Sequence, residues 1–186
     1  MVVADPSDNA GGGAPSDATP ILRRLLDRGI GDAALGPIWD PIAVQFCHAA
    51  GEGAKLALRF AGKVGPSSGT PIDAEVEILR VVKDATQTFG PSIAEMGDCA
   101  AIRVGGVDVV LVTRRRQALG NDLFGNLGID LSTKKIVVVK STNHFYASFA
   151  PIAKEVLYVD AEGPLPRDLR KLDYRNIERP KWPFDA

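Results

Sequence analysis

Residues 136–145 read Ile-Val-Val-Val-Lys-Ser-Thr-Asn-His-Phe, and this stretch decides the fold class. The run 136–139 is continuously branched and apolar, which is typical of a strand that is covered on both faces of a parallel sheet. Polar residues follow at once, and a helix is predicted from about Phe145 to Glu155, kinked or split by Pro151. This order of elements indicates an α/β domain whose ligands lie at the carboxyl ends of the strands.

Other segments of the chain also show the strands and helices expected of an α/β domain. Short strands are predicted at residues 2–4 and 157–160, and helices are predicted to open at Pro20 and Pro41, each behind a capping residue. The second helix has a predicted apolar face of Ile42, Ala43, Phe46, Cys47 and Ala50. The strand at residues 2–4 is shorter than a buried parallel strand usually is, so we expect the chain to begin inside an element.

Other segments show β patterns. Alternation with a period of two from Lys55 to Arg80, around a turn-rich loop at 62–71, predicts two antiparallel strands. Residues 100–113 predict a hairpin that turns at the Gly105-Gly106 pair. We therefore predict an α/β fold with a layered, mostly parallel sheet that is flanked by helices and carries an inserted antiparallel β-unit.

Composition restricts the function. The chain has 186 residues, enough for one domain, and 45% of them are hydrophobic. A formal net charge of -1 argues against a nucleic-acid-binding or membrane-surface protein. Cys47 and Cys99 lack the spacing of a metal site and are expected to be buried, and the sequence shows no signal-peptide pattern, so we expect none. These features favour a cytoplasmic protein.

A glycine-rich loop follows the first predicted strand. It contains Asp5, Asp8, Asn9 and the triplet Gly11, Gly12 and Gly13. Glycines let a backbone approach a ligand and present several N–H groups to it, although the spacing matches neither nucleotide-binding glycine motif. The alternative is a tight turn in which Asp8 and Asn9 cap backbone groups.

A second candidate site lies at the end of the buried strand, at Lys140, Ser141 and His144. His144 is either a base, a metal ligand or a hydrogen-bond donor, or it is a structural residue near the start of a helix. Ser141 lacks the surroundings of a nucleophilic serine, so a serine hydrolase is disfavoured.

Two further segments carry charge. Arg114, Arg115 and Arg116 follow a predicted strand and either clamp a carboxylate or pair with acidic residues across an interface. The loop 62–69, with Lys63, is either functional or an ordinary connection between strands.

Histidines are too few for a zinc hydrolase of the usual kind. Such an enzyme needs three converging protein ligands, but the chain has two histidines, of which His48 is expected to be idle on a helix. No HExxH motif is present. The residues by themselves predict an α/β domain of undefined use.

Several motifs resemble the C-terminal domain of the MlrC (microcystinase C-like) metallopeptidase family, in the family's order and over nearly the whole chain. The motifs are Asp5-x-x-Asp8-Asn9-x-Gly11-Gly12-Gly13-Ala14-Pro15-x-Asp17, Ile38-Trp39-Asp40-Pro41, Gly62-Lys63-x-Gly65-Pro66, Thr113-Arg114-Arg115, residues 138–153, Tyr158-Val159-Asp160 and Arg179-Pro180-x-Trp182. Ala10, Ala61 and Asn143 depart from the family pattern, where proline, glycine and glutamine are usual.

The resemblance implies that residues 1–186 are one MlrC-type C-terminal domain of a zinc-dependent peptide or amide hydrolase. It implies that the zinc ligands belong to an N-terminal domain without a counterpart here, which would be the partner of this chain, and no zinc is expected in this chain alone. It also implies that His144 is a candidate catalytic residue and that the substrate is contacted by Asp8, Asn9, Gly11, Gly12, Gly13, Lys140, Ser141 and Arg114. The alternative is a stand-alone binding domain without hydrolytic activity, and self-association through an exposed interface is a further expectation.

Overall fold

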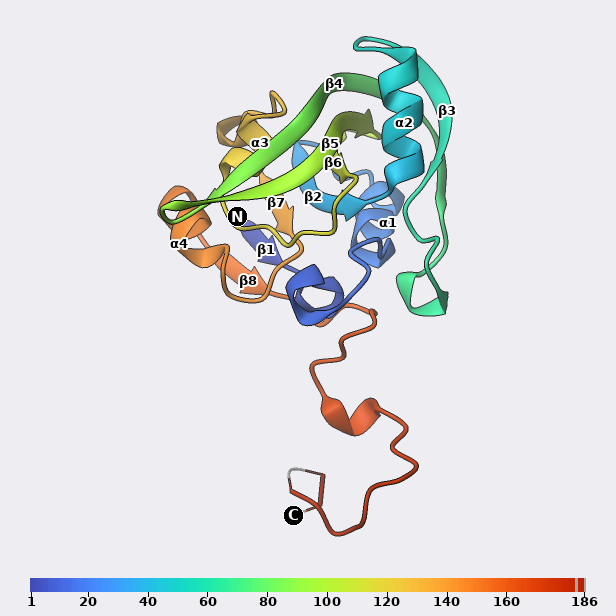
Figure 1. The fold of residues 1–186 in the computed structure, drawn as a ribbon, viewed down its shortest axis with the longest axis vertical. Helices are drawn as coiled ribbons and strands as arrows, with labels where there is room; N and C mark the ends of the chain where they lie inside the picture. Colours follow the sequence, from blue (N-terminus) through green and yellow to red (C-terminus); the bar gives the residue numbers. More distant parts are fainter. Residues whose placement is uncertain (183, 186) are drawn as a thin grey trace.

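The computed structural model describes residues 1–182 and 184–185, and in this part of the chain one eight-stranded sheet forms the centre of the fold. The strand order is β3-β4-β5-β6-β2-β7-β1-β8 (Figure 1). The strands are β1 (Val2–Ala4), β2 (Ala33–Trp39), β3 (Lys55–Phe60), β4 (Ile72–Phe89), β5 (Ser92–Val104), β6 (Val107–Val112), β7 (Ile136–Val139) and β8 (Val156–Tyr158).

One part of the sheet is parallel. Strand β1 lies between β7 and β8 and pairs in parallel with both, and β2 pairs in parallel with β6 and β7. The run 136–139 therefore forms a strand inside the sheet, with Val137, Val138 and Val139 buried. The carboxyl ends of these parallel strands meet at one edge of the sheet, which we call the carboxyl edge.

The rest of the sheet is antiparallel. Strands β3, β4, β5 and β6 pair in succession, which confirms the predicted β-unit and the hairpin at 105–106. Strand β4 is much longer than the pattern predicted, since it continues past Arg80 to Phe89 and turns into β5 at Ser92. Register shifts between residues 78 and 86 interrupt the alternation, so the sequence pattern fades although the pairing continues.

Strand β2 was not predicted from the sequence. Its residues Ala33–Trp39 include Gly36-Pro37, a pair that normally argues against a central strand. A register shift between Leu35 and Ile38 accommodates the proline. A Cβ atom at Gly36 would lie 2.9 Å from Val110, so only glycine fits against the neighbouring strand.

Helices cover both faces of the sheet, as the layered fold requires (Figure 1). Core residues of α1 (Pro20–Asp27) and α2 (Pro41–Ala50) pack on one face, and those of α3 (Asp122–Gly125) and α4 (Tyr146–Phe149) pack on the other. After β8 the chain first packs against the body, where Leu165 N donates to the carbonyl oxygen of Ser7, and its C-terminal part then extends away as an arm (Figure 1). None of the helices in the described residues is long and apolar enough to cross a membrane.

Two helix predictions need correction. The helix predicted from about Phe145 to Glu155 is split near Pro151, as one of the two predicted alternatives has it, but it is shorter: a single turn, α4, is followed by a 3-10 turn at Ala150–Ile152. Helix α2 buries Ala43, Val44 and Cys47, whereas Ile42 and Phe46 of the predicted apolar face are each 56% exposed. The helix is therefore rotated relative to the predicted face.

The two thiols provide a test of this packing. Cys47 and Cys99 are both buried, and burial raises the pKa of the Cys47 thiol to about 11 and that of Cys99 to about 12. Because the thiolate is the reactive form, the native protein should not react with a disulfide reagent such as DTNB at pH 8, and both thiols should react in denaturant. Rapid modification of either thiol under native conditions would contradict the packing.

Candidate functional site

The loops that follow β1, β6 and β7 meet at the carboxyl edge. They comprise residues 5–19, 113–121 and 140–145, and they contain every residue that the sequence analysis singled out as catalytic or substrate-binding. Parallel strands bring their carboxyl ends together, so residues more than a hundred positions apart become neighbours. The candidate site is thus a consequence of sheet topology.

A buried ion cluster lies at the base of this edge. The Nζ atom of Lys140 lies 3.2 Å from Asp5 Oδ2 and 2.8 Å from Asp8 Oδ2, and it donates to the carbonyl oxygen of Ala18 at 3.0 Å. Lys140 is 2% exposed. Burial by itself lowers the pKa of a lysine, but the two carboxylates outweigh this effect and raise the pKa of Lys140. The ammonium group is therefore charged and holds two loops together.

Asp8 and Asn9 organise the glycine loop. Asp8 accepts hydrogen bonds from the backbone N–H groups of Ser16 at 2.8 Å and Ala18 at 2.7 Å. The Asn9 side chain accepts from the N–H of Gly11 at 2.8 Å and donates to Thr142 Oγ1 at 2.8 Å. These bonds join the loop after β1 to the loop after β7.

The three glycines serve packing and backbone geometry. A Cβ atom at Gly11 would lie 2.6 Å from the Gln117 side chain, one at Gly12 would lie 2.6 Å from Leu165, and Gly13 has a φ of 96°. Their N–H groups all donate within the loop, to Asn9 or Ala10. The interpretation in which several glycine N–H groups face a ligand is therefore not the arrangement in this structure.

His144 lies exposed at the top of the edge and is held from two sides. Its Nδ1 atom is 2.8 Å from Nε2 of Gln117, whose Oε1 accepts from Ser141 Oγ at 3.3 Å. The Phe89 ring at the tip of the β4–β5 hairpin meets the imidazole edge-on, with 5.1 Å between ring centroids. His144 is thus an accessible imidazole in a fixed orientation.

Gln117 was not among the predicted site residues. The main chain around it is fixed by Gln87, which is fully buried on β4, donates to the carbonyl oxygen of Gln117 at 3.0 Å and accepts from Leu119 N at 2.9 Å. The only sequence signal for Gln117 is its position directly after the arginine run. The long β4–β5 hairpin that contacts it was also longer than the sequence predicted.

The three arginines have different surroundings. Arg114 forms an ion pair with Glu95, and Arg116 Nε donates to the carbonyl oxygen of Glu95 at 3.0 Å. Arg115 stacks over Trp39 with its Cζ 3.8 Å from the ring centroid. Within residues 1–182 and 184–185, Arg115 has no hydrogen bond or ion pair. Of the three arginines, only Arg114 has an acidic partner among the described residues, so a carboxylate could bind Arg115 or Arg116 without displacing one.

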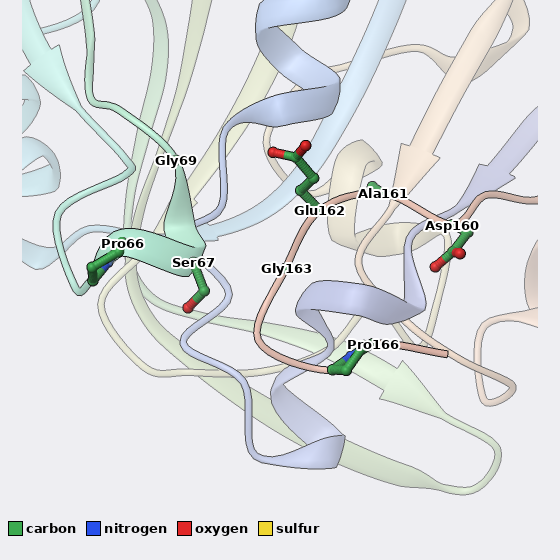
Figure 2. A pocket seen from close by; sticks show the side chains of 8 residues that line it. All are labelled: Pro66, Ser67, Gly69, Asp160, Ala161, Glu162, Gly163 and Pro166. Atoms are coloured by element: carbon green, nitrogen blue, oxygen red, sulfur yellow. The ribbon is translucent and has the colours of Figure 1, made fainter. Parts of the chain in front are cut away.

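The Lys63 loop is tied to the same edge. Asp17 accepts from the N–H groups of Lys63 and Val64 at 2.8 and 2.9 Å and from Ser68 Oγ at 2.5 Å, and Lys63 Nζ lies 2.8 Å from Asp40. A pocket of about 330 Å³ lies between this loop and the segment after β8 (Figure 2). Its lining residues are Pro66, Ser67, Gly69, Asp160, Ala161, Glu162, Gly163 and Pro166.

The site residues fall into three groups. The first group is linked through Thr142 and Gln117 and consists of Asn9, Gly11, Ser141 and His144. The second group lies beneath the first in the interior and consists of Asp8 and Lys140. The third is Arg114, which pairs with Glu95. Asp8 and Lys140 have almost no exposed surface, so their part in a site is to hold the loops that carry the others. The described residues contain no group of three or more His, Cys, Asp or Glu side chains placed to hold a metal ion.

Replacement of Lys140 tests the buried cluster. Lys140→Met leaves the carboxylates of Asp5 and Asp8 buried without a counter-charge, so we expect a loss of about 3–5 kcal/mol in the free energy of unfolding, measured with urea. Lys135→Met is the matched control, because Lys135 pairs with Asp32 at 2.9 Å on the surface, where both side chains are mostly exposed. Equal effects of the two substitutions would contradict the central role of the cluster.

Comparison with known proteins places these features in context. A sequence model described as MlrC C-terminus matches residues 3–176. Microcystinase C from Sphingomonas sp. is 36% identical over 185 residues, which cover 100% of this chain and 36% of that protein. A crystal structure from Mesorhizobium sp. BNC1, described as a candidate metallopeptidase, superposes with a TM-score of 0.86 at 25% identity and is covered to 38% of its length. The chain thus spans little more than a third of each of these relatives.

Proposed function

Since the chain belongs to the MlrC family and corresponds to its C-terminal domain, we propose that it forms the substrate-binding side of a metal-dependent peptide or amide hydrolase. The observation that carries this proposal is the exposed His144, fixed at the carboxyl edge by Gln117 and Phe89. Exposed polar groups on a rigid edge of an α/β sheet are the usual means by which such folds contact a substrate.

The metal of this proposal is zinc, and it belongs to a separate metal-bearing domain in the same or another polypeptide. The described residues of this chain do not provide a set of ligands for zinc. When bound in its own domain, zinc would polarise the scissile carbonyl and activate a water molecule. This chain would orient the substrate across the cleft between the two domains.

The proposed contacts follow from exposure and charge. His144 and the exposed backbone of Gly11, Gly12 and Gly13 face the substrate, while Asn9 and Ser141 fix the loops behind them. Arg115, stacked on Trp39, is placed to bind a substrate carboxylate, whereas Arg114 would first have to leave Glu95. The free thiols fit a reducing, cytoplasmic setting, which is also part of the proposal.

A hybrid enzyme tests the function. We expect the 186-residue chain alone to neither retain zinc nor hydrolyse a linear peptide, and a hybrid in which it replaces the matching segment of microcystinase C to hydrolyse one. His144→Ala should lower kcat/KM of the hybrid by about 10²–10³, as expected when a donor to a developing negative charge is removed. His48→Ala is the control, because His48 lies on α2 and contacts the Cys99 carbonyl oxygen.

Two results would refute this function: tight stoichiometric zinc with turnover in the chain alone, or an active hybrid that is indifferent to His144→Ala. A second candidate function is a binding domain without hydrolytic activity. The exposed Arg115 guanidinium, stacked on Trp39, and the exposed His144 are compatible with it, because both can bind a peptide without a metal. It predicts that the chain alone binds a linear peptide, while the metal-loaded hybrid does not cleave it.

A further inference from the structure

The side chain of Gln117 lies between two residues of the candidate site. Its Nε2 atom is 2.8 Å from His144 Nδ1, and its Oε1 accepts from Ser141 Oγ at 3.3 Å. An amide has one donor end and one acceptor end. In this orientation the donor end faces His144, so Nδ1 of His144 is the acceptor of the bond.

This bond determines which imidazole nitrogen carries the proton. A neutral imidazole has one N–H and one bare nitrogen. Because the bare nitrogen is Nδ1 and is occupied by Gln117, the proton is on Nε2. Nε2 has no partner among residues 1–182 and 184–185, and the His144 side chain is exposed. The ring therefore presents an N–H donor outward.

We propose that Gln117 is a positioning residue that holds His144 as a neutral Nε2–H donor, so that this point of the site binds an oxygen acceptor, namely a carbonyl oxygen or a carboxylate. In this state His144 is neither a general base nor a metal ligand, because both roles need a bare nitrogen that faces the site. The proposal deepens the proposed function and rests on it for the kind of substrate, a peptide or amide.

Gly11 makes room for this arrangement. A Cβ atom there would lie 2.6 to 2.7 Å from the three terminal atoms of the Gln117 amide. Any other residue at position 11 would push the amide away from His144. Gly11 thus allows the Gln117 amide to reach His144, although Gly11 lies more than a hundred residues from that histidine in sequence.

Nuclear magnetic resonance on the ¹⁵N-labelled chain tests the state of His144. With two histidines in the sequence, His48 serves as an internal reference. Because His48 Nε2 lies 3.1 Å from the Cys99 carbonyl oxygen, it must donate and should also carry its proton on Nε2. For His144 we expect a proton on Nε2, a bare Nδ1, and a coupling across the hydrogen bond between Gln117 Nε2 and His144 Nδ1. A proton on Nδ1 would mean that the amide has the opposite orientation and would overturn the proposal.

Two substitutions separate positioning from a merely structural role. Gln117→Glu places an acceptor opposite Nδ1, so the proton should move onto Nδ1 while the His48 signals stay unchanged. Gly11→Ala should displace the amide and abolish the coupling across the hydrogen bond. Gly65→Ala is its matched control, because a Cβ atom there meets nothing within 4 Å. Retention of the wild-type His144 signals in both Gln117→Glu and Gly11→Ala would overturn the proposal.

The hybrid enzyme links this state to turnover. Gln117→Glu should lower kcat/KM by about 10- to 100-fold with unchanged zinc content, and Gln117→Asn, whose shorter amide cannot span the gap, should also be impaired. Unimpaired turnover of Gln117→Glu, with Nδ1 shown to be protonated and Nε2 shown to be bare, would overturn the role of the donor. If the proton is on Nε2 but His144→Ala leaves the hybrid fully active, the proposed function fails while the assignment of the protonation state holds.

Discussion

The ammonium group of Lys140, buried between Asp5 and Asp8, is the interaction on which the carboxyl edge depends. It joins the end of β7 to the loop after β1 at distances of 2.8 and 3.2 Å from the two carboxylates. A charge with 2% exposure is tolerated only when it is compensated and hydrogen-bonded, and Lys140 also donates to the Ala18 carbonyl oxygen. The two loops are therefore fixed relative to each other before any ligand arrives.

The rest of the edge is built outward from this cluster. Asp8 uses its remaining hydrogen-bonding capacity on the backbone of residues 16–18, which closes the glycine loop. Asn9 then links that loop to Thr142, and the closed loop leaves the space above Gly11 into which Gln117 fits. Asp8 and Lys140, which the sequence offered as ligand contacts, thus lie inside the domain together with Asn9 and Ser141. His144 and Arg114 are the predicted contacts with exposed side chains.

This layering agrees with the proposed function, in which the chain contributes substrate recognition and another domain holds the metal. The family match covers residues 3–176 and the similarity to microcystinase C covers 100% of the chain, while the chain spans 36% of that relative. In the proposed function, the fixed imidazole and the stacked arginine present hydrogen-bond donors and positive charge to a substrate, and zinc supplies the remaining chemistry from another domain.

The sequence by itself determined the α/β class, the antiparallel unit and the positions of the polar loops. These features follow from patterns among neighbouring residues: branched apolar residues at 136–139, proline after capping residues, and alternation of apolar and polar residues from Lys55 onward. Each pattern can be interpreted without knowledge of distant contacts. Strand β2 was not predicted because a Gly-Pro pair, here Gly36-Pro37, normally interrupts a strand. The orientation of α2 was predicted wrongly because Ile42 and Phe46 are large apolar residues of the kind usually found in a core. Which site residues are buried and which are exposed depends on the packing of distant segments and could not be predicted from local patterns. The pairing of Lys140 with Asp8 and of Gln117 with His144 joins distant loops, and no local pattern encodes the order in which parallel strands lie side by side.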